Sequence, residues 1–288
     1  MTLEEIRFFL DRPVQESDLK ASIETLAEER QMFRVGDFYS LKDNPWLAER
    51  RAKGNQRAEK LLAIASRSSR FLFQFPFVRG IGISGSLSKN YADENADIDY
   101  FIITQSNRLW IARTFMHLFK KLSFLVGKQH WYCMNYYVDE EAMEIPEKNI
   151  FTAIEMITLL PAGGNGGLVR FFEANNWANE YLPNYRHKKR QPEGSWKDSF
   201  LKKSLEKLFS GRAGNWLEKY FCDLTTRRWQ QKEARGTLNI KGEKMTLRTG
   251  KHFSRPNPEI LQKRVIMVYN SKLHELGVPE ERRRAFPR

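Results

Sequence analysis

Two aspartates, Asp97 and Asp99, stand two residues apart at the start of the apolar stretch "DIDYFIIT" (97–104). Alternate residues of a strand point to the same face, so the two carboxylates are expected to project side by side. Like charges this close repel each other and raise each other's pKa unless a cation lies between them. Mg²⁺ takes carboxylate oxygens while it also binds phosphate. The pair therefore predicts a metal site.

Gly85 and Ser86 follow the apolar segment 78–84 directly. At a strand-to-helix turn, a glycine lets a ligand approach the backbone closely. Exposed amides and the Ser86 hydroxyl can then hold phosphate oxygens at the N-terminus of a helix. Lys89, three residues after Ser86, is either a cation that neutralises the terminal phosphates or an ordinary surface lysine. Together the segments predict that the aspartates hold a metal, the metal holds a triphosphate, and Gly-Ser anchors the triphosphate.

The stretch "ISGSLSKNYADENADIDYFII" (83–103) resembles the polymerase-beta-like nucleotidyltransferases. It has their order of an apolar residue, Gly-Ser, about ten residues and Asp-Ile-Asp within an apolar strand. The resemblance is to minimal, antitoxin-type and aminoglycoside-type members, and the order of expected elements extends it to about residues 55–140. It implies binding of ATP or another NTP with two Mg²⁺ ions, and transfer of an NMP to a hydroxyl on a small molecule, an RNA or a protein, with release of pyrophosphate. Carried over residue by residue, Asp97 and Asp99 are catalytic metal ligands, and Gly85 and Ser86 position the triphosphate. Lys89 is added to the nucleotide-binding residues because of its position and charge alone.

The sequence departs from the family on the next strand, where the family usually has a third carboxylate. Here that strand is "HWYCMNYYVDEE" (130–141), and alternate positions give the inward set Trp131, Cys133, Asn135 and Tyr137. An amide such as Asn135 can ligate Mg²⁺ through its oxygen but cannot act as a base. Asp139 and Glu140, at the strand end, are the alternative third acid. A degenerate, non-catalytic nucleotide sensor therefore stays open beside the enzyme.

The elements around this motif predict an α/β core with a small mixed sheet. A long helix after Pro45, strands near 78–84, 97–104 and 130–138, and a helix at about 108–125 alternate along the chain. After Pro146 the pattern turns mostly helical, interrupted by a loop at 161–168. We therefore expect a nucleotidyltransferase-like core at 46–145 and a basic, mostly helical region at 146–288.

Residues 1–45 are predicted to form a winged-helix-like module. Thr2 and Glu5 have the spacing of a capping box, a second helical pattern follows, and Gly36-Asp37 signals a hairpin. A nucleic-acid-binding regulator is thus another alternative. The second helix would expose Glu24 and Glu28, which repel phosphate, so docking of a protein is the favoured use of this module.

Charge and cysteine content limit the partners and the compartment. Residues 186–288 contain 26 Lys and Arg against 11 Asp and Glu, a balance of +15, so residues 1–185 carry −2 of the formal +13. A contact between the basic C-terminal region and a polyanion is one reading, and a solvated helical surface is the other. Two cysteines without a C-x-x-C spacing favour a reducing, cytoplasmic setting. The apolar runs are too short to span a membrane, so no membrane partner is expected.

Overall fold

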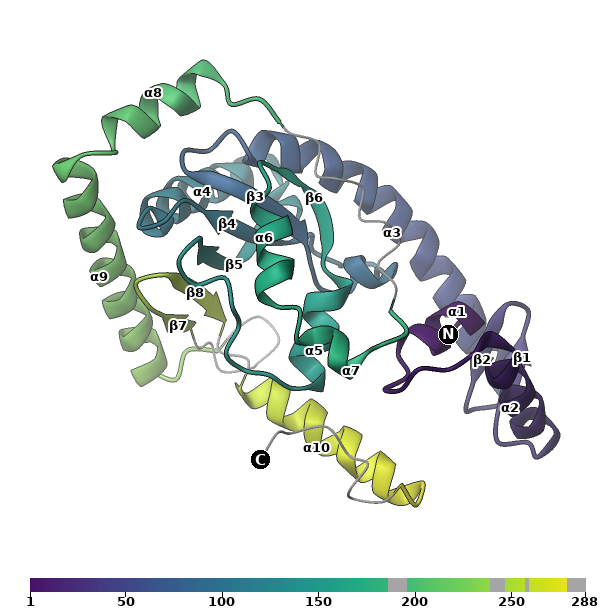
Figure 1. The fold of residues 1–288 in the computed structure, drawn as a ribbon. Helices are drawn as coiled ribbons and strands as arrows, with labels where there is room; N and C mark the ends of the chain where they lie inside the picture. Colours follow the sequence, from purple (N-terminus) through teal and green to yellow (C-terminus); the bar gives the residue numbers. More distant parts are fainter. Residues whose placement is uncertain (186–195, 239–246, 257–258, 279–288) are drawn as a thin grey trace.

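A computed structural model describes residues 1–185, 196–238, 247–256 and 259–278, and a six-stranded mixed sheet lies at its centre (Figure 1). The strand order is β6-β3-β4-β5-β8-β7, with β4 and β5 parallel and the other neighbours antiparallel. The strands are β3 (Val78–Ile83), β4 (Asp99–Thr104), β5 (Cys133–Asp139), β6 (Leu160–Gly164), β7 (Leu247–Thr249) and β8 (Phe253–Pro256). The predicted α/β chain with a mixed sheet is confirmed at this level.

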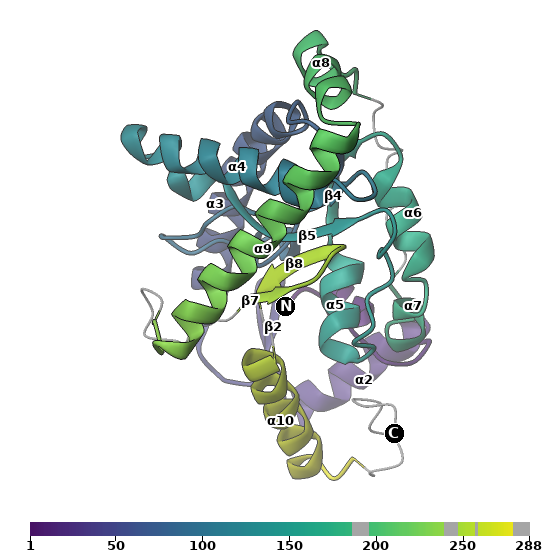
Figure 2. The same cartoon turned by 90° about the vertical axis from the view of Figure 1, so that its left-hand side faces the viewer.

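Helices cover both faces of this sheet (Figure 2). On one face Tyr100 and Ile102 pack with α3 and α4, and on the other Phe101 and Ile103 pack with α5 to α7. The helices are α3 (Pro45–Leu72), α4 (Leu109–Ser123), α5 (Ile150–Thr158), α6 (Gly167–Ala174) and α7 (Ala178–Tyr181). Because β4 is buried on both sides, its sequence is continuously apolar after Asp99 rather than alternating.

Residues beyond 146 form strands as well as helices. The predicted loop at 161–168 is wrong for 161–164, which pair with β3 as part of β6. A Pro- and Gly-rich segment is typical of a loop, but Pro161 is tolerated here because β6 is an edge strand. Besides α5 to α7, this region contains α8 (Phe200–Leu208), α9 (Arg212–Ala234), which lies beside α4, and α10 (Glu259–Glu275), which packs on α5.

The N-terminal residues form two helices and a hairpin, in the predicted order. These are α1 (Leu3–Phe8), α2 (Glu16–Glu28), β1 (Phe33–Val35) and β2 (Phe38–Ser40). The capping box is present: the Glu5 amide donates to Thr2 Oγ1 at 3.2 Å, and the Thr2 amide donates to Glu5 Oε2 at 2.9 Å. Glu24 and Glu28 are exposed on α2, as expected.

Within the described ranges, none of the helices combines the length and the apolar character needed to cross a bilayer.

Candidate functional site

The ends of three strands bring the predicted site residues to one edge of the sheet. Ile83, the last residue of β3, pairs with Tyr100, and Asp99, the first residue of β4, pairs with Cys133, the first of β5. The loop that follows β3 therefore lies next to the segments that enter β4 and β5. Residues 85, 99 and 135, far apart in the sequence, meet here.

Asp99 opens β4, whereas Asp97 lies two residues before the strand, so the predicted strand start at residue 97 is two residues early. The backbone around Ile98 still joins the neighbouring segment: its amide donates to His130 O at 3.0 Å, and its carbonyl accepts from the Cys133 amide at 3.2 Å. The Asp97 side chain is 43% exposed. Burial, supported by the nearby charge of Asp97, raises the pKa of Asp99 to about 6. Two carboxylates that interact in this way favour a cation between them.

Gly85 lies directly against the Asp99 carboxylate. Its φ is +71°, and a Cβ at this position would lie 2.7 Å from Asp99 Oδ2. The neighbouring Ser84 amide donates to the Asp99 carbonyl at 2.9 Å, which holds the loop in place. Only glycine meets both conditions, since another side chain would be strained in this conformation and would also displace the carboxylate.

The loop after Gly85 differs from the predicted helix N-terminus. A single 3₁₀ turn, η1 (Leu87–Lys89), follows, and the Ser86 side chain makes no capping hydrogen bond to it. Ser86 is exposed at this edge. Lys89 Nζ donates to the Gly85 carbonyl at 3.0 Å and pairs with Glu155 of α5 at 2.9 Å. Lys89 therefore ties the Gly-Ser loop to α5, with its charge balanced by a carboxylate.

Asn135 reaches Asp99 because β5 contains a β-bulge. Met134 lies opposite Tyr100 and Tyr136 lies opposite Phe101, which leaves Asn135 as the extra residue. Asn135 Nδ2 donates to Asp99 Oδ1 at 3.0 Å. The predicted inward position of Tyr137 is wrong: the bulge shifts the alternation by one residue, so Tyr137 packs in the core on the other face.

His130 is a site residue that the sequence reasoning missed. It lies in η3 (Gln129–Trp131), just before β5, and its Nδ1 is 2.5 Å from Asp97 Oδ1. The imidazole is 61% exposed. Only its position in the sequence indicates this role. Parallel neighbouring strands begin at the same edge of a sheet, so a residue just before β5 must lie near one just before β4.

Asp139 and Glu140, the alternative third acid, are placed elsewhere. Asp139 pairs with Thr104 at the other end of the β4–β5 ladder. Five residues of strand separate that end from Asp99, a distance of about 17 Å. Neither carboxylate belongs to the Asp97–Asp99 site.

The donors at this edge suit Mg²⁺ that arrives with a phosphate ligand. Among the described residues, no group of three or more His, Cys, Asp and Glu side chains is arranged to hold a metal. Mg²⁺, however, commonly binds one or two carboxylates, keeps several waters and takes other oxygens from substrate phosphates. Asp97, Asp99 and the Asn135 amide fit that incomplete shell.

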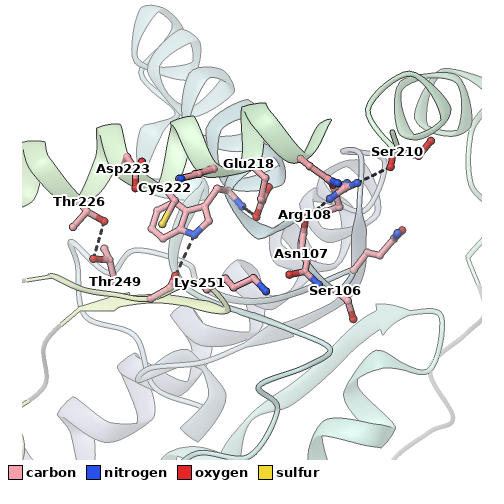
Figure 3. A pocket seen from close by; sticks show the side chains of 15 residues that line it. Ser106, Asn107, Arg108, Ser210, Glu218, Cys222, Asp223, Thr226, Thr249 and Lys251 are labelled. Atoms are coloured by element: carbon pink, nitrogen blue, oxygen red, sulfur yellow. Dashed lines mark hydrogen bonds between the residues drawn. The ribbon is translucent and has the colours of Figure 1, made fainter. Parts of the chain in front are cut away.

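A cavity of about 960 Å³ lies at the opposite end of the sheet, between α9, the start of α4 and the β7–β8 turn (Figure 3). Its buried polar groups serve to join these elements. The Glu218 carboxylate accepts from the Trp110 and Ile111 amides at 2.8 and 2.9 Å, and Arg108 donates to the Ser210 carbonyl at 2.7 Å. Trp110 Nε1 donates to the Gly250 carbonyl at 3.1 Å. This cavity thus has fewer polar groups left for a ligand than its size suggests.

Comparisons of the chain with protein-family models, with curated proteins and with solved structures found no match.

Proposed function

We propose that this protein is a Mg²⁺-dependent nucleotidyltransferase that moves an NMP from an NTP to a hydroxyl-bearing acceptor and releases pyrophosphate. The observation that carries the proposal is the contact between the Gly85 loop and the Asp97–Asp99 pair. A glycine with a positive φ stands where a Cβ would lie 2.7 Å from a carboxylate oxygen. That arrangement supports a ligand that needs both a close backbone approach and a pair of carboxylates, as a metal–triphosphate does.

Each residue then has a distinct role. Asp97 and Asp99 hold Mg²⁺, which when bound stabilises the charge on the reacting phosphate oxygens. Gly85 and Ser86 bind the triphosphate through the backbone and the exposed hydroxyl. Lys89, through its bonds to the Gly85 carbonyl and Glu155, is a positioning residue that fixes the loop.

The proton of the acceptor hydroxyl requires a base, and Asn135 cannot supply one. His130 can, because an imidazole nitrogen can accept a proton and this ring is oriented by its contact with Asp97. Under this proposal His130 takes the proton from an acceptor that enters from solvent.

A non-catalytic nucleotide-binding sensor is the second candidate. Asn135 favours it, because the amide that bonds to Asp99 stands at the position expected for a third carboxylate. In that case the site would bind Mg²⁺ and an NTP without turnover.

For the flanking regions we propose supporting roles. The N-terminal helices and hairpin would act as a winged-helix-like module that docks a protein, since exposed Glu24 and Glu28 disfavour nucleic acid. The basic C-terminal region would contact a polyanionic acceptor.

Transfer of label from NTPs tests the proposal. The parent, incubated with α-labelled NTP, Mg²⁺ and cell extract, is expected to label a discrete acceptor and to release pyrophosphate. Asp97→Asn and Asp99→Asn should each abolish both signals. Asp93→Asn, a change to an exposed acid of the same loop, is the matched control and should behave as the parent. Mg²⁺-dependent NTP binding without transfer would support the sensor instead.

A further inference from the structure

A small cavity of about 180 Å³ adjoins the Asp97–Asp99 site on the same face of the sheet. Ser84 and Glu155 line it, and both also belong to the site: Ser84 bonds to the Asp99 carbonyl, and Glu155 holds Lys89. Phe101 also lines the cavity, and it shares a strand face with Asp99 because it lies two residues further along β4. The cavity is therefore the natural place for the part of a ligand that lies beyond its phosphates.

Three aromatic rings and several aliphatic side chains line this cavity, and the charge of Arg255 in its wall is paired. The Phe101 and Tyr136 rings lie 4.9 Å apart between centroids, and Phe151 adds a third ring. Arg255 also lines the cavity and is only 6% exposed, but Glu147 neutralises it, with Nη1 donating to Glu147 Oε2 at 2.8 Å. A flat, uncharged group suits such a lining better than a charged one.

Gln262 of α10 supplies a polar group to the lining of the cavity. The residue is 8% exposed and lines the cavity. No hydrogen bond joins its amide to any other residue in the described part of the chain. Its amide is not among the fully buried polar groups that lack a partner in the described residues, so it stays accessible from the cavity and a ligand there can bind it.

We infer that this cavity holds the adenine base of the nucleotide, with Gln262 reading the base edge. The inference rests on the proposed function and names its substrate. The cavity is smaller than the roughly 300–1,000 Å³ of a site for a whole drug-sized ligand, so it accommodates one ring system. A glutamine amide presents a donor and an acceptor side by side, which matches N7 and N6 of adenine, whereas guanine offers two acceptors on the same edge.

Calorimetric titrations with ATP, GTP and inorganic tripolyphosphate, all with Mg²⁺, test the inference. The parent is expected to bind ATP roughly 5- to 100-fold more tightly than GTP. Gln262→Leu keeps the size of the side chain and removes its hydrogen bonds, so this preference should disappear while tripolyphosphate binds as before. Gln262→Asn keeps the amide group on a shorter side chain, so it should also reduce the preference for ATP over GTP. Gln230→Leu, at an exposed glutamine of α9, is the control and should change nothing.

The outcomes separate the two proposals. Equal binding of ATP and GTP by the parent, or an ATP preference that survives both Gln262 changes, would overturn the adenine assignment; in either case binding of tripolyphosphate would leave the proposed function standing. Absence of Mg²⁺-dependent binding of any of the three ligands would overturn both.

Discussion

The two ends of the central sheet each place an aspartate beside a histidine, yet the two pairs differ in almost every physical respect. At one end His130 Nδ1 lies 2.5 Å from Asp97, with side chains that are 61% and 43% exposed. At the other end His252 Nδ1 lies 2.8 Å from Asp139, with side chains that are 23% and 0% exposed. The first pair faces solvent beside a second carboxylate, and the second is enclosed.

The hydrogen bonds of the two aspartates Asp139 and Asp99 also differ. Asp139 accepts from the backbone amides of Asn107 and Glu141 at 2.9 and 3.0 Å as well as from His252, so its oxygens are occupied in joining β5 to the loops beside it. Asp99 accepts from the Asn135 amide and lies near another carboxylate, with a raised pKa. A carboxylate saturated with donors has a structural role, whereas a pair of carboxylates that repel each other suits the cation of the proposed function.

The largest effect is expected when Asn135 is changed to Asp. A third carboxylate next to Asp99 would add a charged metal ligand to the base that His130 already supplies, so turnover should rise by roughly 10²-fold or more. Pyrophosphate release measures it, with Asn95→Asp in the exposed loop as the control. Glu140→Gln, at the other end of the sheet, should leave turnover unchanged; if it abolished transfer, the functional end would be assigned wrongly.

Asp139→Asn should destabilise the protein by about 2–4 kcal/mol, because the new amide group would face N–H donors that the carboxylate now satisfies. Urea unfolding measures the free energy. Asp97→Asn, at the exposed end, should stay within about 0.5 kcal/mol of the parent. A smaller loss for Asp139→Asn than for Asp97→Asn would remove the distinction between the two ends.

Ser86→Ala should weaken triphosphate binding more than monophosphate binding. In the proposed function the exposed hydroxyl contacts the departing pyrophosphate, and one hydrogen bond to a charged group contributes about 1.5–3 kcal/mol. Affinities for NTP and NMP, measured on the same samples, give the comparison. Equal losses for both ligands would place Ser86 away from the β- and γ-phosphates.

Asp99→Asn should stabilise the metal-free protein in a pH-dependent way. The folded-state pKa of Asp99 is about 6, above the unfolded value of about 3.9. Ionised Asp99 therefore costs the fold stability above pH 6 and nothing below pH 4, where both states are protonated. Thermal unfolding in EDTA should show a gain of about 1–3 kcal/mol at pH 8 that vanishes as the pH falls from about 6 to about 4. A gain of equal size at pH 4 would contradict the assignment of the pKa.

The sequence predicted the parts of the site that depend on local pattern and missed those that depend on register. Gly85 and Asp99 follow from the turn and the strand that carry them. The β-bulge at Asn135 could not be predicted from the sequence. A strict alternation of side chains along β5 assigns Tyr137 to the wrong face of the sheet, because it does not allow for the extra residue Asn135. The pairs Lys89–Glu155 and Asp97–His130 join segments that are distant in the sequence. The residue types alone do not predict which side chains pair.

Strand β6 illustrates the same limit at the scale of the fold. Pro161, Gly163 and Gly164 are typical of a loop, yet an edge strand needs only backbone groups aligned with β3, which no local propensity reveals. The helices, which depend on local periodicity and caps such as Thr2 and Asn44, were accessible from the sequence.

Isothermal titration of ATP into the parent, once with Mg²⁺ and once with EDTA, tests the central claim most directly. The account predicts saturable binding that requires Mg²⁺ and that Asp97→Asn and Asp99→Asn each remove, while Asp93→Asn preserves it. Binding of equal affinity in EDTA, or Mg²⁺-dependent binding that survives both aspartate changes, would contradict the assignment of this end of the sheet as the metal–nucleotide site.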